Sequence, residues 1–422
     1  MLGFGTCAGA VDIEQQASAV EADVIEWRRH FHQYPELSNR EFETAAYIAR
    51  FLESLDIEVQ TGVAHTGVIG VLRGSKPGAT VALRADMDAL PVPERNDLPF
   101  RSQAKGLYNG EEVDVMHACG HDTHMAMLMG AASILADARD QLAGTVVFIF
   151  QPAEEGSPLG EEGGAELMVK EGVLRDHNVD VAFGIHISAN RDVGSVTYRP
   201  GGMMAGVDDF QILIHGKQTH GSRPWSGIDP IVTAAQMINA LQTIVSREVP
   251  LTENAAVVSV GKIRAGVRSN IIPESAELVG TIRTLDTDHR ELILAAIHRK
   301  AEAIAAGMRA TVEVKVPYSS SYPVTYNDPE LTAQMVPTLN AVAGAENVKV
   351  VDAITGAEDF SFFAREVPGL YVFVGGKPLD TPTEESAPHH TPDFFIDESG
   401  MKTGVKVYAA LAMDYLKANA DE

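Results

Sequence analysis

Short apolar runs alternate with helical patterns along the first half of the chain. The apolar runs are 67–72, 80–85, 145–150 and 179–186, and helical patterns lie near 121–138 and 161–171. Runs that are apolar throughout and separated by helices are typical of strands whose sheet is covered on both faces. The pattern predicts an α/β domain with a mixed, mostly parallel sheet sandwiched by helices, and its chemistry should lie at the carboxyl ends of the strands.

Two helices of this part carry more specific signals. Ser38 followed by Glu41 is the pattern of a capping box, which predicts that a helix begins at Ser38. From His121 onward, apolar residues recur at helical spacing. This spacing predicts an amphipathic helix whose buried stripe contains Met125, Leu128, Met129, Ala132 and Leu135.

The pattern changes from about residue 207. The stretch 209–214 alternates apolar and polar residues, and a helix, two strand patterns, a second helix and a final alternating stretch near 311–316 follow. The order β-α-β-β-α-β is that of a ferredoxin-like α+β domain. We therefore expect an inserted domain at 207–317, between the two parts of the first domain at 11–206 and 318–422.

The first helix of the inserted domain has a clear start. Asp229 is a suitable N-cap, and Pro230 follows it at the first helical position. The apolar stripe that we expect to face the sheet contains Ile231, Ala234, Ala235, Ile238, Leu241 and Val245.

Composition narrows the possible partners. The 422 residues contain 58 Asp and Glu against 33 Lys and Arg, a formal net charge of -25. The basic residues form no stripe, so we expect no nucleic-acid or membrane partner. No apolar run approaches the roughly 20 residues of a membrane span. The residues Ala8-Gly9-Ala10 resemble the end of a signal peptide but follow no basic segment, so we expect a cytoplasmic protein, with the periplasm as the alternative.

The stretch 117–124, with the sequence HACGHDTH, concentrates groups that bind metals. Cys119 and His121 would face apart on a helix, so they can share one ion only if the chain turns there, which Gly120 permits. A thiolate and an imidazole suit zinc or a similar divalent ion. With only two cysteines in the chain, neither a disulfide framework nor a zinc finger is possible. The alternative is that Cys119 is a small core residue and the histidines have capping roles.

Other strand ends carry similar groups. Glu154 and Glu155 directly follow the run 145–150, and one could bind metal while the other acts as a general base. Four segments would bring such groups to one edge of the sheet, which favours a metal site. The further candidates are His186, the pair Asp86 and Asp88, and the pair His389 and His390.

Several motifs occur in order across residues 20 to 415. They are RADMDALP, HACGHDTH, QPAEEG, GIH, GKQTHGSRP, SNIIPESAELVGTIRT, GAEDFS and HHTPDF. Together they resemble the M20 metallopeptidase family, and specifically its amidohydrolase branch, which includes hippurate hydrolases, N-acyl-amino-acid amidohydrolases and plant auxin-conjugate hydrolases.

The resemblance implies a centre with two divalent metal ions per subunit. Zn2+ is favoured, with Mn2+, Co2+ and Ni2+ as alternatives. Glu154 would be the catalytic base, and Asp86 would orient a ligand. Arg84 stands where other branches have a ligating histidine, and Cys119 would replace that ligand. The implied ligands are Cys119, His121, Glu155, His186 and His390.

In the inserted domain, which would be the family's lid, the resemblance implies three further residues. His220 would stabilise the negative charge that develops on the substrate carbonyl, and Asn270 and Arg283 would bind the substrate carboxylate. The alternatives are that His220 caps a turn, that Asn270 belongs to a turn at a strand end, and that Arg283 is an ordinary surface charge.

The expected function is metal-dependent hydrolysis of the amide bond of small N-acyl amino acids, of the hippurate or N-acetyl type. A dipeptidase or carboxypeptidase on the same scaffold is the alternative. A purely structural metal module is disfavoured, because such a site has no use for an extra carboxylate such as Glu154. The absence of a GxSxG motif disfavours a serine hydrolase. We also expect a homodimer through the lid domain.

Overall fold

The computed structural model describes residues 11–319 and 321–420, which form two compact units. Unit 1 contains the residues up to Gly201, Asn327–Val351 and the residues from Phe362 onward, and unit 2 contains Gly202–Tyr326 and Asp352–Ser361. The signal-like residues 8–10 lie outside the described residues. Within the described ranges, no helix is long and apolar enough to cross a bilayer.

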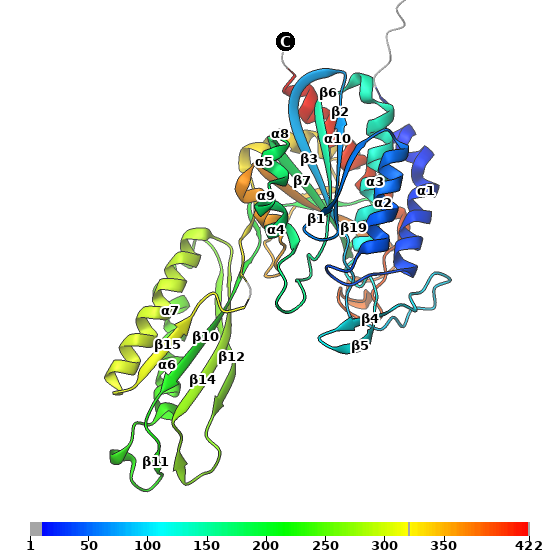
Figure 1. The fold of residues 1–422 in the computed structure, drawn as a ribbon. Helices are drawn as coiled ribbons and strands as arrows, with labels where there is room; N and C mark the ends of the chain where they lie inside the picture. The colour runs from blue at the N-terminus through cyan, green and yellow to red at the C-terminus, as the bar shows by residue number, and fades with distance from the viewer. Residues whose placement is uncertain (1–10, 320, 421–422) are drawn as a thin grey trace, which may run out of the picture. The chain divides into compact units, whose positions relative to one another are not determined.

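Unit 1 is built on one eight-stranded sheet (Figure 1). Its central strands β6, β3, β7 and β19 are parallel, and β2 and β1 continue it antiparallel at one edge. This confirms the predicted mixed, mostly parallel sheet. In spatial order the strands are β1 (Glu58–Val63), β2 (Gly67–Arg73), β6 (Ala143–Gln151), β3 (Lys76–Asp86), β7 (Val181–Asp192), β19 (Gly369–Lys377), β8 (Val196–Tyr198) and β18 (Val348–Val350).

Helices cover the sheet, as the apolar strands require. Figure 1 shows α1, α2 and α3 on one side of the sheet and α4 and α5 on the other. The helices are α1 (Ile13–Gln33), α2 (Phe42–Ser54), α3 (His121–Asp137), α4 (Gly164–Lys170), α5 (Val173–Asp176), α8 (Pro329–Ala343), α9 (Phe360–Glu366) and α10 (Met401–Ala418). A short hairpin of β4 (Lys105–Tyr108) and β5 (Glu111–Asp114) precedes α3.

The helix α3 is buried on nearly every side. All the apolar residues predicted for its stripe are buried, but so are polar positions such as Asp122 and Thr123. The prediction of an amphipathic helix was therefore wrong. The reason is that α1 and α10 both pack against α3, so it has no face toward solvent. Asp122 is accommodated there because Arg28 of α1 lies 2.8 Å from its carboxylate.

The predicted capping box at Ser38 was also wrong. The helix α2 begins at Phe42, and the carboxylate of Glu36 accepts hydrogen bonds from the backbone N–H groups of Glu43 and Thr44 in its first turn. The Ser38 hydroxyl instead donates to Asp88, at 2.7 Å. A tertiary contact has replaced the local one that the spacing suggested.

Unit 2 has the predicted order of elements, and its antiparallel sheet has the strand order β12-β14-β10-β15. This is the arrangement of a ferredoxin-like domain. Phe210, Ile212 and Ile214 are fully buried on one face of β10. The elements are β10 (Gly206–His215), α6 (Pro230–Arg247), β12 (Ala256–Ala265), β14 (Ser275–Thr284), α7 (Thr287–Gly307) and β15 (Thr311–Lys315).

The helix α6 begins as predicted, because the Asp229 carboxylate accepts hydrogen bonds from the next backbone N–H groups. Its buried face is rotated from the predicted stripe, however. Ile231 is 41% exposed, whereas Met237 and Ile244, which we had not included, are fully buried. Both sets have helical spacing, so periodicity alone could not choose between them.

Candidate metal centre

The candidate residues of unit 1 gather where β3 and β6 end. These parallel strands are in register at their last residues, Asp86 and Gln151. Beyond that point the first strand leads to Asp88 and the second to Glu154 and Glu155. The shared register therefore brings all four carboxylates to one edge of the sheet.

His186 lies within a strand, not at its end. The strand β7 loses its pairing with β3 after Gly184 but stays paired with β19, so it continues to Asp192. The prediction of a strand end at His186 was wrong for this reason. The continued pairing holds the His186 backbone, and Nε2 of its imidazole reaches the Cys119 thiol.

Gly120 makes the turn that the stretch 117–124 needs. Its φ of 103° lies in the left-handed region, and a Cβ there would lie 2.4 Å from Cγ2 of Ile187. No other residue type fits both conditions. The turn places Cys119 before the helix and His121 in its first turn, so both side chains reach the carboxylates.

A first group of possible ligands surrounds the Cys119 thiol. Sγ of Cys119 lies 3.4 Å from Nε2 of His186 and 3.3 Å from Nε2 of His390. The same nitrogen of His390 is 3.1 Å from the carboxylate of Glu155. Thiol, imidazole and carboxylate at these spacings can converge on one cation.

A second group surrounds His121. Its Nε2 lies 3.7 Å from Glu154 and 3.9 Å from Glu155, and all these atoms are close enough to bind one ion. Because Glu155 belongs to both groups, its carboxylate can bridge two metal ions. The structure therefore brings together all five residues that the sequence suggested as ligands, together with Glu154.

The imidazoles are oriented for metal binding. Nδ1 of His121 donates to the Asp88 carbonyl at 2.8 Å, and Nδ1 of His186 donates to the Ile187 carbonyl. In the neutral form of each ring, which metal binding requires, these bonds leave the lone pair of Nε2 directed at the cluster. Nε2 of His121 is buried and has no hydrogen-bond partner in the described part of the chain. Such a buried, unpaired atom is expected of a ligand whose cation is not part of the structure.

The charges around the cluster call for a cation. Burial lowers the pKa of His121, but the carboxylates of Asp86 and Asp88 outweigh it and raise that pKa to about 10. Burial raises the pKa of the Cys119 thiol well above its usual value, and Glu155 and Glu154 raise it further. A bound divalent ion would lower the pKa of the Cys119 thiol again, because a cation favours the thiolate. The donor set thus fits zinc or a similar ion.

The other histidines of these motifs have different surroundings. Nδ1 of His389 donates to the Cys119 carbonyl and Nε2 accepts from the Ala189 N–H, both at 3.0 Å, so neither nitrogen is available to a metal. His390, with a positive φ of 63°, is directed at Cys119 instead. This geometry favours the choice of His390 over His389. His117 is buried, and neither ring nitrogen has a hydrogen-bond partner among the described residues.

Asp86 is held on two sides. Its carboxylate accepts a 2.6 Å hydrogen bond from His124 and pairs with Arg84 at 2.7 Å, and all three side chains are fully buried. Nε2 of His121 is 3.8 Å away. Asp86 therefore lies beside the cluster and is suited to orienting its members, whereas Arg84 supplies a fixed positive charge at the position of the missing histidine.

Asp88 is a candidate from the sequence for which no role was predicted. One carboxylate oxygen of Asp88 accepts the backbone N–H of Glu154 and the other accepts that of Glu155, both at 3.0 Å. Glu41 binds the preceding N–H, that of Ala153, at 3.0 Å. Two buried carboxylates thus fix the loop that carries the proposed base. The short spacing between Asp86 and Asp88 was the signal that could have indicated this.

We expect Asp88→Asn to lower kcat about 10- to 100-fold, the range typical of groups that orient metal ligands. The amide has one acceptor oxygen, so one of the two N–H groups loses its partner. Steady-state kinetics and metal titration measure the effect, and thermal unfolding tests whether the fold is kept. Asp114→Asn, at an exposed ion pair with Lys105, is the control. Wild-type turnover and metal affinity in Asp88→Asn would show that Asp88 does not position the loop.

The candidates of unit 2 fall into two places. His220, on β11 (Thr219–His220), pairs with Ile271 of β13 (Ile271–Ile272), next to Asn270. Arg283 lies near the opposite end of β14 from Ser275. The extended strand between these two residues is about 26 Å long. Arg283 donates to Thr281, at 2.9 Å. One copy of unit 2 therefore brings His220 and Asn270 together but leaves Arg283 apart.

A sheet that gathers a thiol, three imidazoles and adjacent carboxylates at one edge suits metal-assisted hydrolysis. The sequence model of peptidase family M20/M25/M40 matches residues 82–414 of this chain. The chain therefore belongs to this family.

Relatives agree with this assignment. Thermostable carboxypeptidase 1 of Saccharolobus solfataricus is 41% identical, covering 96% of this chain and 98% of its own. N-acetylcysteine deacetylase of Bacillus subtilis is 38% identical, covering 94% and 98%. The crystal structure of the Bacillus subtilis YXEP protein, described as a dinuclear metal binding peptidase, is 35% identical with a TM-score of 0.76, covering 95% and 99%. The chain thus belongs to the amidohydrolase branch of this family.

Proposed function

We propose that the protein hydrolyses N-acyl amino acids to a carboxylic acid and a free amino acid. The observation that carries this proposal is the pair of adjacent glutamates: Glu155 lies in both ligand groups, whereas Glu154 lies in the group around His121 and not in the group around Cys119. One carboxylate can then hold metal while its neighbour handles a proton. A site that only held a metal for structure would not need the second carboxylate.

The proposed ligands are Cys119, His121, Glu155, His186 and His390. When bound, two divalent ions would lower the pKa of a water molecule and polarise the amide carbonyl. Glu154 would take the proton of that water and pass it to the leaving nitrogen, while the oxygen of the water becomes part of the new carboxylate. The thiol and imidazole donors favour zinc over manganese, cobalt and nickel.

The roles of His220, Asn270 and Arg283 stay predictions. The homodimer also stays a prediction, although the edge strand β12 exposes Val257 and Ile263 in a way that suits pairing with a second copy.

A carboxypeptidase activity is the second candidate, because the archaeal relative named above is a carboxypeptidase. A substrate panel separates the two. The stripped protein, reloaded with Zn2+, Mn2+, Co2+ or Ni2+, should release amino acids from N-acetyl and N-benzoyl amino acids faster than from unblocked dipeptides, measured by an amine-reactive assay. Faster release from dipeptides or blocked peptides with every metal would contradict the proposal and favour the alternative.

A further inference from the structure

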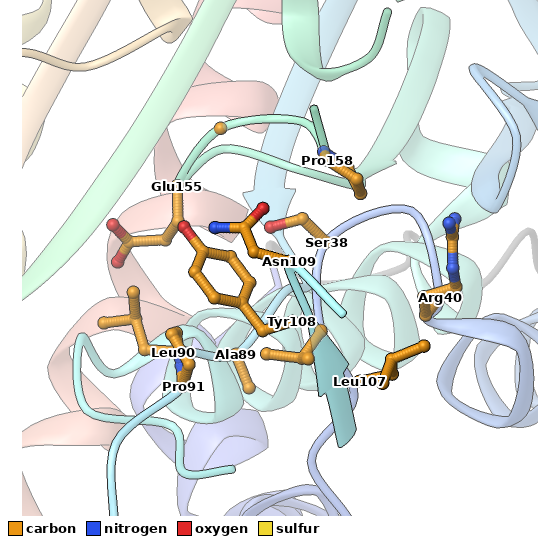
Figure 2. Close-up of a pocket in the computed structure, with 12 residues that line it drawn as sticks. Ser38, Arg40, Ala89, Leu90, Pro91, Leu107, Tyr108, Asn109, Glu155 and Pro158 are labelled. Atoms are coloured by element: carbon orange, nitrogen blue, oxygen red, sulfur yellow. The ribbon is translucent and has the colours of Figure 1, made fainter. Parts of the chain in front are cut away.

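A pocket in unit 1 begins at the metal centre. Figure 2 shows its lining, with the Glu155 carboxylate at one end and Arg40 at the opposite end. The pocket leaves about 70 Å³ for the centres of water-sized spheres, several times the roughly 10 to 15 Å³ that one water molecule needs. A group that extends from a carbonyl bound beside Glu155 therefore has room to enter it.

Between these ends, apolar side chains share the lining with the polar groups of Ser38, Asn109 and Tyr108. One wall comes from Leu37 and from Leu90 and Pro91, which follow β3, and the other comes from Leu107 and Tyr108 of the hairpin. Apolar walls bind a hydrocarbon chain by removing its surface from water.

The hairpin that carries Leu107 and Tyr108 has a defined position. Its tip, at Asn109 and Gly110, has positive φ values of 52° and 86°, as a tight two-residue turn requires. Its base lies so close to Leu37 that a Cβ at Gly106 would be 2.7 Å from that side chain. The pocket wall is therefore a built part of unit 1.

The lining offers no unengaged cationic side chain to an anionic occupant. Arg40 is the cationic side chain of the lining, and its guanidinium already binds both carboxylate oxygens of Glu161, at 2.6 and 3.1 Å. A substrate carboxylate would therefore find no side-chain partner along the pocket. Of the two parts of an N-acyl amino acid, the amino-acid part carries the carboxylate, so only the acyl part suits this pocket.

We infer that this pocket receives the acyl group of the substrate and that the preferred acyl group is neutral, apolar and longer than acetyl. This inference rests on the proposed function and adds the substrate class to it.

The test compares N-hexanoyl-, N-acetyl- and N-succinyl-methionine as substrates of the metal-loaded protein and of the double variant Leu107→Ala/Tyr108→Ala. Both side chains are exposed, at 74% and 45%, so their removal should leave the fold intact. We expect kcat/KM for the hexanoyl substrate to fall about tenfold and that for the acetyl substrate to change less than twofold. The control is Leu159→Ala, which is 94% exposed and outside the lining, and should behave as wild type.

The outcomes separate the two levels of the proposal. An equal loss for hexanoyl and acetyl substrates, no loss for either, or a wild-type preference for the succinyl substrate would overturn the pocket assignment and leave the proposed function standing. If the wild type released methionine from none of the three, the proposed function would fail, and the pocket assignment would fail with it.

Discussion

Replacing Glu154 with Gln is expected to lower kcat by about 10³- to 10⁴-fold, the upper range for loss of a general acid–base group. The glutamine side chain has nearly the same shape, so its neighbours His121 and Glu155 keep their positions. It cannot take up a proton, however, and both the attack of water and the departure of the amine need that transfer. Metal content should remain at two ions per chain.

Stopped assays at high enzyme concentration, with elemental analysis of the same samples, measure both quantities. Glu162→Gln is the matched control, because Glu162 is exposed and its side chain pairs with Lys170, outside the cluster. It should retain wild-type kcat. Near-normal turnover in Glu154→Gln would show that another group acts as the base.

Replacing Cys119 with Ala is expected to remove one of the two metal ions and, with it, nearly all activity. The thiol is the atom around which His186 and His390 gather, at 3.4 and 3.3 Å. Without it, this ion has two imidazoles and the shared Glu155 carboxylate, and its affinity should fall. The ion at His121 would keep His121 and the shared Glu155 carboxylate.

Elemental analysis after dialysis should give about one ion per chain instead of two. Added zinc should also raise Tm less than in the wild type, because an ion that binds more weakly stabilises the folded protein less. The exposed His65 provides a control, since His65→Gln removes an imidazole outside the cluster and should keep two ions. Full metal content in Cys119→Ala would show that the thiol is not a ligand.

Much of the fold and the cluster could be predicted from the sequence. Apolar runs such as 145–150 identify buried strands directly, because a strand covered on both faces has no polar side. The rule that chemistry gathers at the carboxyl ends of parallel strands then indicated that Cys119, Glu155 and the pair His389 and His390 meet, and the family resemblance selected His390 from that pair. Neither step requires knowledge of a distance.

What could not be predicted depends on contacts between distant segments. Ser38 has the local pattern of a cap, but the choice between the helix end and Asp88 is made by tertiary structure. The continuation of β7 past His186 depends on β19, from the far end of the chain. The hydrogen bonds of Asp88 to the loop at Glu154 likewise join residues that only the sheet register brings together.

The two sides of the centre differ in how firmly they are held. His186 belongs to a strand that stays paired past the imidazole, whereas His390 belongs to a loop and its side chain is 53% exposed. Ions of different radius need ligand distances that differ by tenths of an ångström. Adjustment of this single outer imidazole can supply that difference without disturbing the sheet, which gives the protein a physical basis for working with several transition metals in turn.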